Sequence, residues 1–302
     1  MSRIYEALQR AELDRKGTPD LADEPLVATA TATEPVQHVA PNEFDPNRVA
    51  RYAWRPNVTS LPTLAERGEA VEQFRSLRSH IYQLRYQAAL KTIIVSSGTP
   101  SEGKSFVTAN LAVSLARNNE RNVLLIDGDL RRPTVHKLFG APNNSGLSEF
   151  LSGTAEISEV MQRNTEVGPS EVQGVRDLSN LTLITAGVSG ENSLELVGNH
   201  RIEALVEAAT PHFDWILIDS PPVLAVTDAV DLARAADGVL LVARGTSTPY
   251  DIAQRAAQAF SNARLLGFVL NAVKDAPKGG YYYNYYGYHD SNDPKRRKDK
   301  RR

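Results

Sequence analysis

The stretch "KTIIVSSGTPSEGKSFVTANLAVSLA", Lys91–Ala116, contains the two patterns that decide the fold. It opens with an apolar run rich in β-branched residues, typical of a short buried strand. Gly98–Ser105 then fit the spacing G-x-x-x-x-G-K-S, and a helical pattern follows at once. In the order strand, glycine loop and helix, backbone N–H groups and the helix N-terminus converge where they can bind phosphate. We therefore predict a nucleotide triphosphate site rather than a structural glycine turn.

The residues of this loop have separate expected roles. Lys104 is placed to reach the β- and γ-phosphates of ATP, and the Ser105 hydroxyl to bind Mg²⁺. Asn271, at the end of the last predicted strand, is a candidate for contact with the adenine ring, although Asn is also common in turns. The other residues expected at the nucleotide are Gly98, Thr99, Pro100, Ser101, Glu102, Gly103 and Phe106.

Similar apolar runs recur along the chain, separated by stretches of helix length. Continuous rather than alternating hydrophobicity indicates strands that are buried on both faces. The sequence therefore predicts an α/β fold, a parallel β-sheet with helices on both faces, whose ligands bind beyond the carboxyl ends of the strands. The predicted strands are residues 91–97, 122–127, 181–186, 215–220, 238–243 and 265–273.

Aspartates stand at two of these strand ends. "VLLIDGDLRRP" places Asp127 and Asp129 there, and "WILIDSPPV" places Asp219. Beside a phosphate loop, such carboxylates hold Mg²⁺ directly or through water, so we predict Ser105, Asp127 and Asp219 as metal ligands. A spare carboxylate could act as general base on a hydroxyl or water. Any one Asp alone could instead be a turn or cap residue.

Other residues narrow the chemistry. The chain has no cysteine and six scattered histidines, which removes thiolate metal sites and a Cys nucleophile. The predicted catalytic set is thus Lys104, Asp127, Asp129 and Asp219. Arg131 and Arg132 could stabilise phosphoryl charge, but a solvated pair at a strand end is the commoner case.

Taken together, the motifs resemble those of a known family. "GTPSEGKS", "LLIDGDLRRP" and "ILIDSPPVLAVTDA" resemble the Walker A, A′ and B motifs of the bacterial tyrosine kinases of capsule and exopolysaccharide systems. "GLSEFLSG" (146–153) resembles the family's next segment. Glu72, Arg75 and Arg78 fit its E-x-x-R-x-x-R oligomerisation pattern, although spacing of this kind also suits ion pairs within one helix. The resemblance spans about residues 67–275.

This resemblance implies a P-loop ATPase fold related to the partitioning and septum-positioning ATPases. It also implies a ring-shaped homo-oligomer that binds ATP and Mg²⁺ and phosphorylates the tail of each subunit in a neighbour's site. A separate membrane chain-length protein would activate the kinase, and a phosphotyrosine phosphatase would reverse it. Thr99 stands where the partitioning ATPases carry a signature Lys, which favours the kinase branch. Residues 185–197 lack the prolines of the corresponding family segment.

The C-terminal stretch "GGYYYNYYGYHD", Gly279–Asp290, is the candidate phosphate acceptor. Residues 281–302 carry seven Lys or Arg and three Asp, a net charge of +4, which leaves −6 on the rest of the chain. A solvated end, or the interaction segment of an ATP-hydrolysing switch or scaffold, is the alternative. We expect no nucleic-acid partner, because the acidic body would repel a phosphate backbone. The predicted acceptors are Tyr281, Tyr282, Tyr283, Tyr285, Tyr286 and Tyr288.

The sequence divides into four parts. We predict an N-terminal helix at 1–17, a disordered linker at 18–62 rich in Pro, Ala and Thr, a kinase domain at 63–275, and a flexible tail at 276–302. The domain opens with a helix near 64–88. No apolar run is long enough to span a membrane, and charges occupy the N-terminus where a signal peptide would be apolar. We therefore expect a cytoplasmic protein that a partner recruits to the inner face of the plasma membrane.

Overall fold

The computed structural model describes residues 48–117, 121–165, 178–188 and 201–273. The predicted N-terminal helix, residues 18–47 of the predicted linker and the tyrosine-rich tail lie outside the described residues, as do residues 189–197 of the segment that lacks the family prolines.

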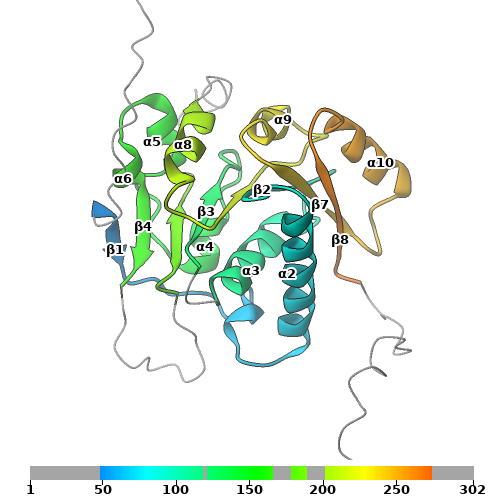
Figure 1. Cartoon of the computed structure of the whole chain (residues 1–302), viewed down its shortest axis with the longest axis horizontal. Helices are drawn as coiled ribbons and strands as arrows, with labels where there is room; N and C mark the ends of the chain where they lie inside the picture. The colour runs from blue at the N-terminus through cyan, green and yellow to red at the C-terminus, as the bar shows by residue number, and fades with distance from the viewer. Residues whose placement is uncertain (1–47, 118–120, 166–177, 189–200, 274–302) are drawn as a thin grey trace, which may run out of the picture. The chain divides into compact units, whose positions relative to one another are not determined.

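The strands form one eight-stranded sheet in the order β1-β4-β5-β3-β6-β2-β7-β8 (Figure 1). Every neighbouring pair is parallel except β4 and β5, which are antiparallel. The predicted parallel α/β sheet is thus confirmed, and all six predicted strands are present. The strands are β1 (Ala50–Tyr52), β2 (Thr92–Ser97), β3 (Val123–Asp127), β4 (Met161–Asn164), β5 (Leu181–Ile184), β6 (Trp215–Asp219), β7 (Gly238–Arg244) and β8 (Leu265–Asn271).

The sequence did not predict β1 and β4. Both are short, and their sequences, "ARY" and "MQRN", contain no apolar run. They pair with each other at one end of the sheet, and β4 also pairs with β5. A strand near the end of a sheet has less apolar surface to bury, so its sequence carries a weaker signal.

Helices cover both faces of the sheet, as predicted (Figure 1). Neighbouring residues of one strand point to opposite faces: Ile93 and Val95 of β2 pack in one apolar cluster, and Ile94 in the other. The first cluster includes α2 (Glu69–Gln87), α3 (Lys104–Ala116), α4 (Val135–Phe139) and the 3₁₀ turn η2 (Pro62–Leu64). The second includes α5 (Leu147–Ser152), α6 (Ile157–Val160), α8 (Arg201–Ala209), α9 (Asp228–Ala233) and α10 (Tyr250–Ala259).

The first long helix has the apolar stripe that its sequence predicts. Val71, Phe74 and Ile81 of α2 are buried, and Leu77 and Leu84 are partly buried against the same cluster. None of the helices in the four described ranges is both long enough and apolar enough to cross a membrane.

Residues 48–62, placed by the sequence in the disordered linker, belong to the folded domain, so the predicted linker boundary is wrong. Trp54 is buried, its ring meets Phe139 edge-on at 5.8 Å, and its Nε1 donates to Gln162 Oε1 at 3.2 Å. Leu61 is buried in the same cluster as α2 and α3. The segment looks like linker because its buried side chains are widely spaced among polar residues and prolines.

We predict that Trp54→Ala lowers the free energy of unfolding by about 3–5 kcal/mol, the usual effect of removing a buried aromatic side chain. Chemical denaturation of the purified chain measures this. Tyr52→Ala is the control, because Tyr52 lies two residues away and is exposed. Equal stability of the two variants would mean that residues 48–62 do not contribute to the core.

Candidate functional site

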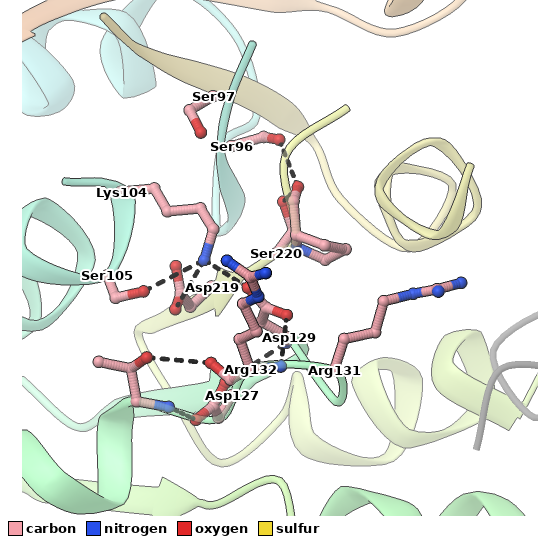
Figure 2. Close-up of polar contacts among 12 residues, drawn as sticks. Ser96, Ser97, Lys104, Ser105, Asp127, Asp129, Arg131, Arg132, Asp219 and Ser220 are labelled. Atoms are coloured by element: carbon pink, nitrogen blue, oxygen red, sulfur yellow. Dashed lines mark hydrogen bonds and ion pairs between the residues drawn. The ribbon is translucent and has the colours of Figure 1, made fainter. Parts of the chain in front are cut away.

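Three adjacent strand ends build the candidate site. In the sheet β2 lies beside β6, and β6 lies beside β3. The register pairs Asp219 of β6 with Val95 of β2 and with Asp127 of β3. The phosphate loop begins where β2 ends, so the fold brings the loop and both Walker aspartates to one edge of the sheet (Figure 2).

Lys104 lies at the centre of this group. It opens α3, directly after Gly103, whose φ of 94° is a left-handed conformation that suits glycine. The Lys104 Nζ lies 2.7 Å from Asp129 Oδ2, 3.7 Å from Asp219 Oδ2 and 3.2 Å from Ser105 Oγ (Figure 2). Burial alone would lower the pKa of Lys104, but the carboxylates of Asp219 and Asp129 outweigh it and raise the pKa. Lys104 therefore carries its charge at neutral pH.

Asp127 is buried and held by backbone amides. Its Oδ2 accepts hydrogen bonds from the N–H groups of Thr134 and Val135, each at 3.0 Å, at the start of α4. Its Oδ1 accepts the N–H of Asp129 at 3.3 Å. Burial, and then the nearby charge of Asp219, raise the pKa of Asp127 to about 7. Asp127 can therefore gain or lose a proton near neutral pH.

Asp219, like Asp127, is fully buried. Thr108 Oγ1 donates to its Oδ1 at 3.3 Å, but its buried Oδ2 accepts no hydrogen bond. Burial raises the pKa of Asp219, although the Lys104 charge opposes the shift. A buried carboxylate oxygen without a donor is costly unless a cation lies nearby.

The residues present fit Mg²⁺. Asp219 Oδ2 accepts no hydrogen bond, and its cationic neighbour is Lys104 Nζ at 3.7 Å. This oxygen and the hydroxyl of Ser105 are hard oxygen donors of the kind that Mg²⁺ binds in P-loop proteins. Both oxygens of Asp127 already accept backbone N–H groups, so its geometry suits contact through water. When bound, Mg²⁺ would neutralise phosphate charge beside Lys104.

The phosphate loop is also supported from the end of β7, the strand beside β2. Glu102, a buried loop residue, accepts the N–H of Thr99 at 2.8 Å through Oε2 and the hydroxyl of Thr248 through Oε1. Arg244, at the end of β7, donates to the carbonyl of Ser101 at 3.2 Å. Local sequence gives no signal for the contacts of Thr248 and Arg244 with this loop, because more than 140 residues separate the partners along the chain.

Asn271 also contacts this loop. Its Nδ2 donates to the carbonyl of Glu102 at 2.9 Å, and its Oδ1 accepts the N–H of Ala272. It packs so close that a Cβ atom added to Gly103 would lie 2.0 Å from Nδ2. Asn271 therefore positions the phosphate loop, and its predicted contact with adenine stays a prediction.

The side chains of Arg131 and Arg132, the two arginines after Walker A′, point in different directions. Figure 2 shows the Arg131 side chain pointing away from Lys104, whereas that of Arg132 points toward the Lys104 ammonium. Arg131 Nε donates to Asp228 at 3.1 Å, and the backbone N–H of Arg132 donates to Asp129 at 3.1 Å. Of the two, Arg132 is the one placed to meet phosphoryl charge.

The three residues of the oligomerisation pattern also separate. Glu72 and Arg75 form an ion pair at 3.4 Å, and each side chain is 53% exposed. Arg78 instead donates to the carbonyl of Ser114 in α3, and burial lowers its pKa. Glu72 and Arg75 are thus available to a neighbouring molecule, while Arg78 ties α2 to α3.

A phosphate loop after a central parallel strand, with carboxylates at the next strand ends, defines a ParA-type P-loop nucleotide triphosphatase. The family model described as "ParA: NUBPL iron-transfer P-loop NTPase" matches residues 89–292. The chain is 33% identical over 222 residues to tyrosine-protein kinase YwqD of Bacillus subtilis (strain 168), covering 73% of this chain and 87% of YwqD. The chain belongs to the bacterial tyrosine kinase family.

Two further comparisons agree. The chain is 35% identical over 236 residues to tyrosine-protein kinase etk of Escherichia coli (strain K12), a match that covers 76% of this chain and only 30% of that longer relative. The solved kinase domain of Escherichia coli tyrosine kinase ETK superposes with a TM-score of 0.60 at 29% identity, covering 82% of this chain and 99% of that domain.

The raised pKa of Asp127 predicts a pH-dependent stability effect. Folding raises this pKa from 3.8 to about 7, so the folded chain holds a proton that the unfolded chain releases in this window. Stability from this carboxyl is therefore present below pH 4 and is lost as pH rises through 7. Asp127→Asn removes the charge, and we expect its melting temperature relative to wild type to be higher at pH 8 than at pH 5.

Thermal unfolding in EDTA at both pH values measures this difference. Asp237→Asn is the matched control, since Asp237 Oδ2 likewise accepts two backbone N–H groups, from Lys91 at 2.7 Å and Thr92 at 2.8 Å. A difference between Asp127→Asn and wild type that is the same at both pH values would show that Asp127 titrates alike in the folded and unfolded chain.

Proposed function

We propose that the protein is an ATP-dependent protein-tyrosine autokinase that phosphorylates Tyr281–Tyr288 of a neighbouring copy and so regulates polymerisation or export of an exopolysaccharide or capsule. The observation that carries this proposal is the charged Lys104 held between Asp129 and Asp219 at the phosphate loop, in a chain of the tyrosine kinase family. The tail supplies six tyrosine hydroxyls within eight residues.

The site residues divide the work of phosphoryl transfer. The backbone of Gly98–Ser105 and the start of α3 bind the phosphates of ATP. Lys104 turns from Asp129 toward the phosphate oxygens, which compete with that carboxylate for its ammonium. Ser105 and Asp219 would hold Mg²⁺, which would offset phosphate charge. Asp127, with a pKa of about 7, suits proton uptake at neutral pH.

The covalent step balances with these groups alone. The tyrosine oxygen forms a bond to the γ-phosphorus of ATP, the bond from that phosphorus to the bridging oxygen breaks, and ADP leaves with the electron pair. The phenolic proton passes to the general base. Arg132, whose side chain points toward the Lys104 ammonium (Figure 2), would stabilise the charge on the transferred group.

The same proposal extends to partners and place. The exposed pair Glu72 and Arg75 supports a contact between copies in a ring. A separate membrane chain-length protein would activate the kinase at the inner face of the plasma membrane, a phosphotyrosine phosphatase would reset it, and the protein itself would reside in the cytoplasm. These assignments rest on the family resemblance.

Transfer in trans is tested with two variants mixed together. Lys104→Met keeps the acceptor tail but lacks the phosphate-binding ammonium, and we expect its activity to fall on the order of 10²-fold or more. A second chain, cut after residue 275, keeps Lys104 but has no tail. With ATP and Mg²⁺, mass spectrometry should find phosphate on Tyr281–Tyr288 only in the mixture.

Lys137→Met is the control for loss of a lysine, because Lys137 is exposed on α4. Circular dichroism must show that Lys104→Met is folded. ATP turnover by the wild-type chain without any phosphotyrosine, even with the activator's cytoplasmic segment added, would refute the kinase assignment and favour an ATP-hydrolysing switch or scaffold.

The ring contact is tested by the different surroundings of Arg75 and Arg78. We expect Arg75→Ala to lower the oligomer mass in light scattering with an unchanged melting temperature, because its only described ion pair is exposed. Arg78→Ala should lower the free energy of unfolding by about 1.5–3 kcal/mol, as expected for a hydrogen bond to a charged group. An unchanged mass for Arg75→Ala would remove this residue from the interface.

A further inference from the structure

The outer edge of β8 is apolar, and no strand in the described part of the chain pairs with it. β8 ends the sheet, and among the described strands it pairs only with β7 (Figure 1). Its sequence "LLGFVLN" contains no charged residue. Leu265, Phe268 and Leu270, and Val273 just beyond the strand, are exposed. Edge strands of soluble proteins usually carry charges or are covered, because an uncharged edge pairs readily with another strand.

The half of β8 nearest the phosphate loop is regular. A register shift against β7 lies at the start of the strand, after which Gly267–Asn271 pair evenly with Leu240–Arg244. Val269 packs against the α2 and α3 cluster. Phe268 and Leu270 alternate with it and so face the opposite side of the sheet, where Leu270 remains 65% exposed.

We propose that the tyrosine cluster of the same chain, Tyr281–Tyr286, docks along this edge as an antiparallel ninth strand while it is unphosphorylated. Ala272, with φ of 50°, begins to turn the chain directly after β8. The spacer "KDAPKGG", residues 274–280, then contains the Pro and Gly residues from which reversals are made. A segment tethered this closely has an effective concentration in the millimolar range, well above that of a second copy.

The composition of the tail fits this edge. Tyrosine has a high strand propensity, and aromatic rings on one strand pack well on apolar residues of the next. In a strand, alternate tyrosines would cover Phe268 and Leu270 on one face and Val269 on the other.

Docking would keep the tyrosines away from a phosphate loop. Asn271, at the end of β8, contacts that loop through the Glu102 carbonyl. An antiparallel strand of six residues leads away from this point for about 20 Å. Docking on β8 and entry into a neighbour's site therefore exclude each other. This mutual exclusion rests on the proposed kinase activity. Release by phosphorylation rests on it too, since each phosphate adds a charge of about −1.5 to −2 per tyrosine.

The absence of cysteine from the whole chain makes disulfide trapping a clean test. Leu270→Cys is combined in turn with Tyr283→Cys, Asn284→Cys and Tyr285→Cys, and dilute, phosphatase-treated protein is oxidised without ATP. A disulfide needs Cα atoms within about 7 Å. Because neighbouring strand residues face opposite sides, we expect an intramolecular disulfide whose yield alternates between consecutive tail positions.

The matched control replaces Leu270→Cys by Val188→Cys. Val188 is 63% exposed and follows β5, five strand spacings from β8 in the sheet, roughly 24 Å away. Equal yields at consecutive tail positions, or equal yields from Val188→Cys, would overturn docking. The single variant Leu270→Cys tests whether a second copy of the chain occupies the edge instead. A disulfide-linked dimer of this variant would assign the edge to a second copy and would also overturn the proposal.

Hydrogen exchange provides an independent measurement without substitutions. Deleting residues 276–302 should speed exchange of the β8 amides at least tenfold while leaving β2 unchanged, and an unchanged β8 would contradict docking. Phosphorylated tail should lose both the disulfide and the protection. If a phosphorylated tail still docks, release by phosphorylation is refuted. If the tail never gains phosphate, the kinase proposal is refuted, but the result on docking of the unphosphorylated tail is still valid.

Discussion

The site depends on a single buried cation, Lys104. Its ammonium binds Asp129 from the loop after β3 and Asp219 from the end of β6, and its backbone opens the helix after β2. Three strand ends are therefore joined by one side chain. Asp127 adds a third carboxyl, so the buried site holds more acid than base. Burial is the main cause of the raised pKa of Asp127, and the charge of Asp219 adds to it. One oxygen of Asp219, Oδ2, accepts no hydrogen bond.

The excess of carboxyls over lysine also explains why the site can bind a proton or a divalent cation. One lysine cannot fully compensate three carboxyls, so the chain gains by holding a proton on Asp127 or by binding a divalent cation beside Asp219. In the proposed mechanism, phosphate binding would draw Lys104 toward the nucleotide and would leave the carboxylates available to a metal ion. Behind the loop, Glu102 is fixed by Thr248 and Asn271, so the loop backbone need not rearrange when Lys104 moves.

The sequence predicts well whatever is local. The phosphate loop, the strand-end aspartates and the six predicted strands each lie in one short run, and their positions in a parallel sheet follow from the fold class. The sequence did not show that the last of these strands, β8, is exposed at the edge. Contacts between distant segments carry no such signal. Asn271 reaches the phosphate loop only because β7 and β8 add to one side of β2. Trp54 is buried only because β4 and α4 receive it. The pattern that groups Arg78 with Arg75 cannot show that one contacts α3 and the other faces solvent.

The position of β8 explains how docking of the tail could affect phosphoryl transfer. Asn271 fixes one end to the phosphate loop, so the tail begins at a defined distance from the chemistry. A strand held by backbone pairing tolerates exchange of one tyrosine for another, which suits a cluster of six. It does not tolerate a phosphate against Phe268 or Leu270, because a charge on apolar surface must be desolvated. One phosphate on the covered face would suffice to weaken docking, whereas reversing the tail's charge of +4 takes about three. As phosphates accumulate, the tail would therefore first leave the β8 edge, and its net charge would reverse only later.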